Sequence, residues 1–527
     1  MRFFYILASV ALIICGHLAA AQQLTGPRGE VFTARVVARQ LSAPWEITYG
    51  PDNFLWLTEA HGYRVSRIDP ATGTKTVLLD LSHERQFPRY DKIPDSVDGG
   101  KPWPQGGLMG LALHPQLLQG QPYVYLAYLY RFAGAGQPGK GGAPNYGGYF
   151  FTTRVVRYEY QPQTQTLARP VVLCDTLPGS SDHNGGRLAI APVNGKDYLF
   201  YAIGDLGAGQ FDNGGRPNHA QSAAHYEGKI LRFNLVPDAD ANPADQWVPN
   251  DNPLAPPGGQ SAVWSLGHRN PQGLAYAVVG GVGRLYESEH GPYSDDEINI
   301  IEPGRNYGHP LVIGYPDGNY NGLAAGVSDR ASLPGAWHTA YPFIASEQAT
   351  AAALGASFRA PIKTLYPNSS QFLTDLYGRM RRHDPQSPEW PSEAPSSLAV
   401  YTSAAIPGWQ NSLLLPTLKH GKLIRLPLNA AGTGVSGDTL TYFRAPVRYR
   451  DVALAPDGRR LFLATDSASV SSGPSKADPK GTACQGCIIE FTYQRGGAAS
   501  PPTLAPRRQQ RAANLRGPRA AGGKIRP

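Results

Sequence analysis

The sequence predicts an all-β protein with the fold of a six-bladed β-propeller. Its 527 residues include 60 glycines and 48 prolines, and long helical patterns are nearly absent, which favours strands and turns. One pattern recurs six times: an apolar strand, a turn of Pro, Asp, Asn or Gly, and a second strand rich in aromatic and β-branched residues. Six copies predict six blades, because radial repetition buries sheet faces and leaves few open edges. The copies occupy residues 44–57, 110–128, 186–205, 272–289, 408–426 and 451–466.

An array of β-sandwiches is the alternative to a propeller. Such an array needs boundaries where few contacts cross, usually in polar or Pro/Gly-rich linkers. The sequence shows no shift in composition and no linker that would divide residues 22–495 in this way. We therefore expect one propeller domain over residues 22–495.

The N-terminus has the pattern of a signal peptide over residues 1–21. Met1 and Arg2 precede an apolar run over residues 3–15, and three alanines at 19–21 suit cleavage before Gln22. A run of roughly 13 residues is shorter than the about 20 that span a membrane as a helix. An anchored N-terminal helix is the alternative. We expect export of the mature chain, so that the protein is periplasmic or secreted.

The C-terminal residues 496–527 form a basic tail. They contain seven Lys and Arg residues and no acid, which is +7 of the net charge of +8. The propeller domain is therefore nearly neutral, and nothing in it indicates nucleic-acid binding. A basic tail rich in Pro, Ala and Gly is predicted to be disordered. Attraction to an anionic membrane or polymer is an alternative role for it.

The mature chain keeps three cysteines, Cys174, Cys484 and Cys487. Haem attachment would need a histidine after Cys487, where the chain has Ile488, and a zinc ribbon would need a second pair. A local disulfide between Cys484 and Cys487 is the prediction that remains for an exported chain. Cys174 is then an unpaired thiol.

His183 is a candidate general base. It lies in the polar, Gly-rich segment 180–186, directly before an expected first strand of a blade, where it can be exposed at one end of the propeller. A lone histidine is usually structural. Here Asp182 is adjacent and Asp205 ends the next strand, so a carboxylate can orient the imidazole for proton abstraction.

A cationic cluster is expected from Lys419, Arg448 and Arg450, which lie at junctions of loop and strand in late blades. Arg448 and Arg450 alternate, so on one strand they share a face. Two arginines on one face repel each other unless an anion lies between them. The pattern indicates a carboxylate or phosphate ligand, and solvated surface charge is the alternative.

The segments 266–273 and 287–299 are the most informative about function. The first contains the pair Arg269-Asn270, and the second contains a carbonyl-rich turn flanked by carboxylates. Arginine binds anionic groups in a fixed geometry, and hard cations prefer oxygen ligands. Two consecutive loops of this kind indicate an anionic cofactor beside a hard metal ion.

These segments together resemble one family, the soluble pyrroloquinoline quinone (PQQ)-dependent glucose and aldose sugar dehydrogenases of the glucose/sorbosone dehydrogenase group. The similarity extends from about residue 32 to residue 493, and the order and spacing of the motifs are specific. The family fold is also a six-bladed propeller. The matching motifs are at 45–59, 105–115, 180–186, 267–273, 290–310 and 448–451.

The resemblance implies a role for each matching residue. His183 resembles the base that removes the proton of the anomeric hydroxyl, Asp205 would hold it, and Arg269 would lie near the reactive quinone carbonyl. Residues implied to contact the sugar are Gln105, Asp182 and Gln210. Residues implied to contact PQQ are Arg269, Asn270, Asp296, Ser392, Lys419, Arg448 and Arg450.

The resemblance also implies calcium. Gly291 and Pro292 match two residues whose backbone carbonyls bind the calcium ion that activates the quinone as a Lewis acid. Ile313, Tyr315 and Asp317 match a second, structural calcium region, and Glu347 is a candidate for its remaining acidic ligand. The chain departs from the family at His290, where a glutamine is expected, so a titratable group lies near the cofactor metal.

The predicted function is PQQ-dependent oxidation of a glucose-like aldose to its lactone. The expected partners are the aldose, a small or protein electron acceptor and, as in many family members, a second copy of the chain. A calcium-dependent lactone hydrolase is one alternative, but it would need side-chain carboxylates and amides converging on the metal and would not use the cationic cluster. A non-catalytic propeller that binds carbohydrate or protein is the other.

Overall fold

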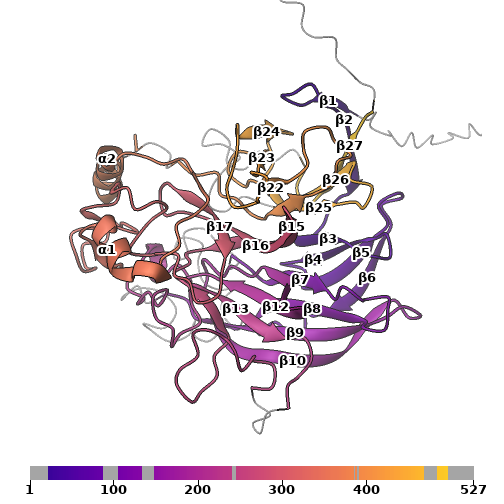
Figure 1. The fold of residues 1–527 in the computed structure, drawn as a ribbon, viewed down its shortest axis with the longest axis horizontal. Coiled ribbons are helices and arrows are strands. Elements are labelled where there is room, and N and C mark those ends of the chain that lie inside the picture. Colours follow the sequence, from indigo (N-terminus) through magenta and orange to yellow (C-terminus); the bar gives the residue numbers. More distant parts are fainter. Residues whose placement is uncertain are drawn as a thin grey trace, which may run out of the picture.

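The computed structural model describes residues 22–86, 105–132, 148–239, 245–384, 386–387, 391–467 and 484–495. Six sheets of four or more strands make up most of this part of the chain, and Figure 1 labels most of their strands. The prediction of an all-β, six-bladed propeller is confirmed. The predicted signal peptide and basic tail, residues 1–21 and 496–527, lie outside the described residues.

The first three blades follow the chain without interruption, and in each the strands pair in sequence order. Blade 1 contains β3 (Pro44–Tyr49), β4 (Leu55–Glu59), β5 (Arg64–Ile68) and β6 (Lys75–Asp80). Blade 2 contains β7 (Leu108–Leu113), β8 (Tyr123–Phe132), β9 (Phe151–Gln161) and β10 (Thr166–Gly179). Blade 3 contains β11 (Leu188–Val193), β12 (Lys196–Ile203), β13 (Lys229–Asn234) and β14 (Val263–Leu266).

The last three blades include one insertion and the closure of the ring. Blade 4 contains β15 (Pro271–Val279), β16 (Val282–Glu289), β17 (Asp296–Ile301) and β20 (Lys363–Leu365). Blade 5 contains β21 (Ala399–Tyr401), β22 (Ser412–Pro416), β23 (Leu423–Pro427) and β24 (Leu440–Tyr442). Blade 6 contains β25 (Tyr449–Leu454), β26 (Arg460–Thr465), β27 (Ile488–Tyr493) and β2 (Val31–Ala38), with β1 (Gln22–Thr25) outside β2.

Blade 6 is built from both ends of the described chain. Strand β2 pairs antiparallel with β27, so that Phe32 lies opposite Tyr493. Phe32 is fully buried, and its ring contacts those of Trp409, Tyr442 and Phe443 from blade 5. The N-terminal strand therefore closes the ring both by strand pairing and by an aromatic core shared with the neighbouring blade.

The first strands of the six blades line the axis, since each contacts the first strand of the next blade and β25 contacts β3. A buried polar hub ties them together. The Arg187 guanidinium donates hydrogen bonds to the carboxylates of Glu46 and Asp451 and to the carbonyls of Gln272 and Ser396. The Leu111 backbone adds a bond to Glu46, so residues on or beside all six first strands take part.

An insertion separates β17 from β20 and extends beyond blade 4. It contains β18 (Leu323–Ala324), β19 (Phe343–Ile344), α1 (Glu347–Leu354) and η3 (Gly355–Ser357), and α2 (Ser370–Arg381) follows β20. Figure 1 shows α1 and α2 together at one side of the molecule. The side chains of Ser346 and Ser369 cap the two helices by accepting hydrogen bonds from the Ala349 and Phe372 backbones. A short 3-10 turn, η2 (Phe211–Asn213), lies in the loop after β12.

Five of the six predicted repeats coincide with the first two strands of a blade. The fifth, residues 408–426, is displaced, because the first strand of blade 5 is the three-residue β21. Trp409 instead lies in the turn before β22 and packs as a fully buried side chain in the core of blades 5 and 6. A strand of three residues is too short to show a period-2 pattern, which explains the error.

The cysteine predictions are confirmed. Cys484 and Cys487 form a disulfide, and Cys174 is a free thiol. Burial raises the pKa of Cys174 to about 12, so its reactive thiolate form is disfavoured near neutral pH. Among the described residues, no helix combines the length and the apolar character needed to cross a membrane.

Candidate active site

Two loops meet at the end of β12 and position His183. The backbone of His183 has a left-handed φ of 46°, and its carbonyl accepts a hydrogen bond from the Leu206 backbone at 3.3 Å. A Cβ atom at Gly204 would lie 2.1 Å from this carbonyl oxygen. Glycine is therefore required at position 204, because the two loops approach each other too closely for a side chain.

Asp205 orients the imidazole of His183, as predicted. The Nδ1 atom of His183 lies 2.7 Å from one carboxylate oxygen of Asp205. The other oxygen accepts hydrogen bonds from His309 Nε2 at 2.8 Å, Asn218 Nδ2 at 3.0 Å and the Tyr341 hydroxyl at 3.0 Å. Burial alone would raise the pKa of Asp205, but the charges and hydrogen bonds of the two histidines lower it below the usual range.

The opposite nitrogen of His183 faces two further predicted residues. With Nδ1–H donating to Asp205, Nε2 carries the lone pair and can act as the base. The Gln210 amide nitrogen lies 3.0 Å from Nε2 and 2.8 Å from an Asp182 oxygen. The predicted exposure of His183 is wrong: its side chain is buried, since the Gln210 and Asp182 side chains cover it.

Gln105 joins this cluster through its backbone. Its N–H donates to the Ser181 carbonyl at 2.8 Å, and its carbonyl accepts from the Asn184 side chain at 2.7 Å. Asn184 in turn bonds both backbone groups of Ser180. Gln105 is therefore fixed beside the 180–186 loop, although it is 78 residues from His183 in sequence.

Arg269 connects the base to the carbonyl-rich turn. Its guanidinium donates to Gln210 Oε1 at 2.7 Å and to the carbonyls of His290 and Gly291 at 3.2 and 3.0 Å. The backbone N–H groups of Arg269 and Asn270 both donate to one oxygen of Glu289, at 2.6 and 3.1 Å. A carboxylate of blade 4 thus fixes the turn that presents Arg269.

Asp296 and Ser392 lie together and cross-link two loops. The Ser392 hydroxyl is 2.9 Å from both Asp296 oxygens, which also accept from the backbones of Gly291, Glu393 and Ala394. Burial raises the pKa of Asp296 to about 6 despite these donors. The pair was predicted from the family resemblance to contact a cofactor, and here it holds the 291 turn against the 392–394 segment.

The anion between Arg448 and Arg450 belongs to the chain itself. Arg450 binds the Asp466 carboxylate in a bidentate manner at 2.8 and 2.9 Å, and Arg448 Nε donates to it at 3.1 Å. A β-bulge between Tyr449 and Asp451 brings both arginines to Asp466 at the end of β26. Asp466 therefore supplies an anion between the two arginines, and the binding of an external carboxylate or phosphate by this pair stays a prediction. Lys419 is buried in a neighbouring loop.

The second predicted calcium region wraps around Glu347. One oxygen of this carboxylate accepts from the Ile313 backbone at 2.9 Å, and the other accepts from Gly318 and Tyr320 at 3.0 and 3.3 Å. The Tyr315 carbonyl accepts from the Asp317 backbone at 2.8 Å. The segment 313–320 is thus folded over the first residue of α1, which supports including Glu347 in this region.

Sequence reasoning missed Asp295, which lies beside the same segment. One of its oxygens accepts from Ser294 at 2.5 Å and from Asn319 at 2.9 Å, and the other is buried without a hydrogen-bond partner. Burial raises the pKa of Asp295 to about 6. The pair Asp295-Asp296 was a visible signal, because carboxylate oxygens are among the ligands that calcium prefers.

Known proteins resemble this chain over most of its length. The sequence model of the family "Glucose / Sorbosone dehydrogenase" matches residues 41–354 and 378–471. The quinoprotein glucose dehydrogenase B of Acinetobacter calcoaceticus is 34% identical over 526 residues, covering 93% of this chain and 99% of that protein. The aldose sugar dehydrogenase YliI of Escherichia coli K12 is 28% identical over 82% of this chain and 90% of that protein.

Two solved structures share the fold at 24% identity. The PQQ-bound aldose sugar dehydrogenase of Streptomyces coelicolor aligns with a TM-score of 0.54 over 88% of this chain and 98% of that one. The apo form of the soluble aldose sugar dehydrogenase of Escherichia coli aligns with a TM-score of 0.57 over 88% and 100%. The chain belongs to the glucose/sorbosone dehydrogenase family and is a sugar dehydrogenase of that family.

Proposed function

We propose that the protein oxidises a glucose-like aldose at its anomeric carbon to the lactone, with PQQ and calcium. The observation that carries this proposal is the convergence of His183, Asp205, Gln210 and Arg269 in one hydrogen-bonded group. In this group, Nε2 of His183 would act as the base, and the guanidinium of Arg269 supplies a fixed positive charge nearby. Proton removal coupled to a build-up of negative charge nearby is the chemistry that this arrangement favours.

His183 Nε2 would remove the proton from the anomeric hydroxyl of the sugar. The Gln210 amide at 3.0 Å from Nε2 marks the position from which a hydroxyl would donate. Asp205 would keep the correct tautomer before the transfer and stabilise the imidazolium after it. When bound, PQQ would accept the hydride that leaves the same carbon, and calcium would polarise it as a Lewis acid.

The residues present fit both groups. Arg269 Nε is buried without a hydrogen-bond partner, so this guanidinium has a donor left for an anionic cofactor. Arg448, Arg450, Lys419 and Asn270 would together hold the PQQ carboxylates. Glycine is required at position 291, because a Cβ there would lie 1.8 Å from the Ser294 carbonyl oxygen, so backbone carbonyls crowd together in this turn. Gly291 and Pro292 would then hold calcium.

The same test supports a second calcium ion. Asp295 Oδ1 and Asn319 Oδ1 are buried oxygens without hydrogen-bond partners, and they lie beside the segment that contains Ile313, Tyr315 and Asp317. A buried carboxylate oxygen that lacks a donor is stabilised by a cation. We propose that this segment binds a structural calcium ion.

Reduction of an artificial dye by the purified protein tests the proposed function. The protein is treated with a chelator, reconstituted with calcium, and supplied with glucose in the presence and absence of added PQQ. Dye reduction that requires both PQQ and calcium is expected, and a panel of aldoses then defines the substrate. If PQQ binds tightly but no aldose is oxidised, the substrate assignment is wrong. If PQQ does not bind, the cofactor assignment is wrong.

An arginine variant tests the cofactor site separately from turnover. Arg450→Gln removes the bidentate partner of Asp466 and one positive charge of the pair, so the apo protein should bind PQQ more weakly in a spectroscopic titration. Arg64→Gln is the control, because Arg64 is exposed and pairs with Asp80 on blade 1. Equal affinity of the two variants for PQQ would exclude Arg450 from the cofactor site.

A further inference from the structure

A second group of ionisable side chains lies between blades 3 and 4, and the proposed reaction does not use it. His268, Glu287 and Glu289 are all buried, and one potential ligand atom from each lies within 4.8 Å of the others. Glu297 and Asn299 from the next strand adjoin them through hydrogen bonds. We call these five residues the blade 4 cluster.

The register of blade 4 builds this cluster. Glu287 and Glu289 alternate on β16 and therefore project from the same face. The pairing of β16 with β17 sets Glu289 opposite Glu297 and Glu287 opposite Asn299. Two carboxylates directly opposite each other on paired strands repel, so the sheet brings together like charges that need compensation.

In the described part of the chain, no lysine or arginine forms an ion pair that would provide that compensation. Within the described residues, no ion pair joins a lysine or arginine to Glu287, Glu289 or Glu297. Burial, followed by the neighbouring carboxylates, raises the pKa values of Glu287 and Glu297 well above the usual range. A buried anionic group without a partner either takes up protons or binds a cation.

Several polar atoms of the cluster lack hydrogen-bond partners. They are His268 Nδ1, Glu287 Oε1 and Asn299 Oδ1, and all three residues are fully buried. The Asn299 amide already donates to Glu287 and Glu297 at 3.0 and 3.1 Å, which leaves its oxygen available as an acceptor. One nitrogen and two oxygens without hydrogen-bond partners are therefore present in one buried place.

The distance between His268 and Glu289 favours a metal ion over a hydrogen bond. His268 Nδ1 lies 3.5 Å from Glu289 Oε1, which is long for a hydrogen bond between these atoms. Ligands at about 2.0–2.2 Å from a tetrahedral metal are roughly 3.3–3.6 Å apart. The observed separation is the edge length of such a shell.

We propose that His268 Nδ1, Glu287 and Glu289 bind a divalent first-row transition metal ion, with Zn²⁺ as the best fit. An imidazole nitrogen with carboxylate oxygens suits zinc and its neighbours, whereas calcium prefers shells made only of oxygen. His268 Nε2 lies 2.9 Å from the Ser265 hydroxyl, which is the outer hydrogen bond that a metal-bound histidine usually has. The site is separate from the proposed calcium positions.

The position of the site indicates what the metal does. Glu289 Oε1 faces His268, while Glu289 Oε2 holds the backbone N–H groups of Arg269 and Asn270. A metal ion on Oε1 would therefore fix the turn that carries Arg269 toward His183. The inference is a structural metal under the active-site turn, and it holds whether or not the protein uses PQQ.

Zinc titration of the purified full-length protein tests this inference. The protein is first treated with a chelator and then titrated with ZnCl₂ by calorimetry in excess calcium, which fills the oxygen-only sites. Wild type should bind one more equivalent of zinc than Glu287→Gln. If the two proteins bind the same number of equivalents, wild type should bind zinc more tightly by at least roughly 10–100-fold, which is the loss of metal affinity when even an outer hydrogen-bond partner of a ligand is removed. Glu302→Gln is the matched control, because Glu302 follows β17 but pairs with Arg305 and Arg359 at the surface.

Anomalous diffraction at the zinc edge from wild-type crystals gives a readout that needs no variant. A peak between His268, Glu287 and Glu289 is expected after growth with zinc. No peak at saturating zinc, or equal zinc binding by wild type and Glu287→Gln, would overturn the proposal. In that case the carboxyl groups are neutralised by protons, and Glu287→Gln should be at least as resistant to thermal unfolding as wild type.

Discussion

His183 depends on its neighbours for both its tautomer and its direction. Asp205 holds Nδ1, and four other donors hold Asp205: the side chains of His309, Asn218 and Tyr341 and the backbone of Gly207. A carboxylate with this many donors cannot rotate away without losing several bonds. The imidazole is therefore preorganised, which is what a general base requires.

Replacing His183 should separate catalysis from cofactor binding. His183→Ala is expected to lower kcat by roughly the 10²–10⁴-fold typical of general-base loss, while the PQQ affinity stays near wild type because the cationic residues are unchanged. Steady-state kinetics and PQQ titration measure the two effects. His225→Ala, on an exposed loop, is the control. Near wild-type turnover of His183→Ala would remove this residue from the mechanism.

His309 makes a pH-dependent contribution to stability whose sign can be worked out. Burial, opposed by Asp205, lowers the pKa of His309 below its usual value. The folded state then binds fewer protons than the unfolded state below about pH 6.5, so His309 costs stability as the pH falls. His309→Gln keeps a donor for Asp205 and does not titrate.

The difference between the two proteins cancels the contributions of titrating groups that do not interact with His309. The free energy of unfolding of His309→Gln, relative to wild type, should rise as the pH falls from 7 to 5, as measured by urea denaturation at each pH. A relative stability that is constant over this range would mean that His309 has the same pKa folded and unfolded.

The partners of His183 that were predicted from sequence lie close to it along the chain, whereas those that were missed come from distant segments. Asp182 and Asp205 lie within 22 residues of His183, so their proximity could be inferred from one loop and one strand. His309 and Tyr341 reach Asp205 from 104 and 136 residues away. Asp466 was visible as the end of a strand, but its place between Arg448 and Arg450 depends on a bulge that has no sequence signal.

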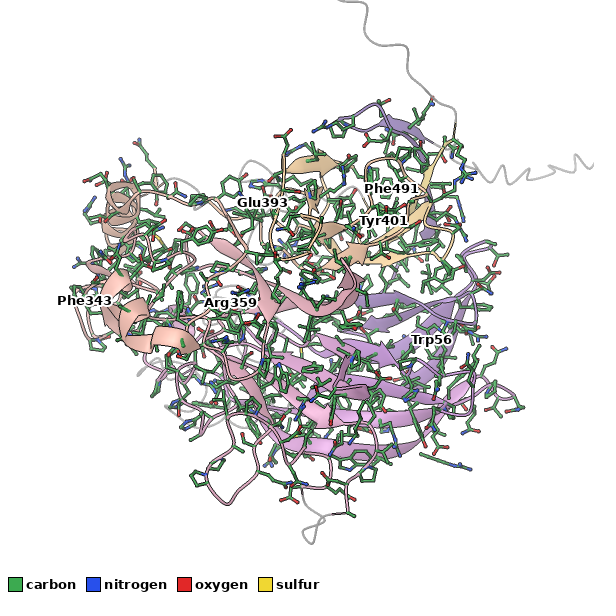
Figure 2. The ribbon with its side chains drawn as sticks, viewed as in Figure 1. Trp56, Phe343, Arg359, Glu393, Tyr401 and Phe491 are labelled. Carbon is green, nitrogen blue, oxygen red and sulfur yellow. A yellow bond between two sulfur atoms is a disulfide. The ribbon has the colours of Figure 1, made fainter. Side chains whose placement is uncertain are left out.

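Blade 6 shows how one strand stabilises two blades. Phe32 on β2 faces Trp409, Tyr442 and Phe443, and Figure 2 shows Tyr401 and Phe491 in the same region of the molecule. Glu30, which directly precedes β2 in the sequence, is buried and accepts hydrogen bonds from Trp409 and Tyr442 at 3.0 and 2.7 Å. The aromatic residues predicted the strands but not the closure of the ring by β2, because β2 and β27 are at opposite ends of the domain sequence.

Truncation of Phe32 should therefore destabilise the closure. Phe32→Ala is expected to lower the free energy of unfolding by about 3–5 kcal/mol, the usual cost of removing a buried phenylalanine. Phe343→Ala is the control, since Phe343 is 60% exposed and lies near α1 in Figure 2. Denaturant unfolding monitored by circular dichroism compares the two. Equal effects of the two substitutions would show that β2 contributes little to closure.

Arg187 lies at the centre of the buried polar hub, to which all six blades contribute residues. Its guanidinium lies 4.4 Å above the Trp45 ring and binds Glu46 and Asp451, whose carboxylates come from blades 1 and 6. Two buried carboxylates share one buried guanidinium, so removing the arginine leaves both without their counter-ion. The Glu46 pKa is already raised by burial, and Arg187 is the main group that opposes this rise.

Arg187→Met should consequently weaken the entire propeller rather than one blade. Loss of one partner from a buried ion pair costs about 3–5 kcal/mol, whereas an exposed pair contributes at most about 1 kcal/mol. Arg64→Met, which breaks the exposed pair with Asp80, is the matched control in denaturant unfolding. Adding Glu46→Gln and Asp451→Asn to Arg187→Met should recover part of the loss, because the cost comes from unpaired charge. If Arg187→Met lowers the free energy of unfolding by no more than Arg64→Met does, then packing between blades, and not the buried polar hub, holds the ring together.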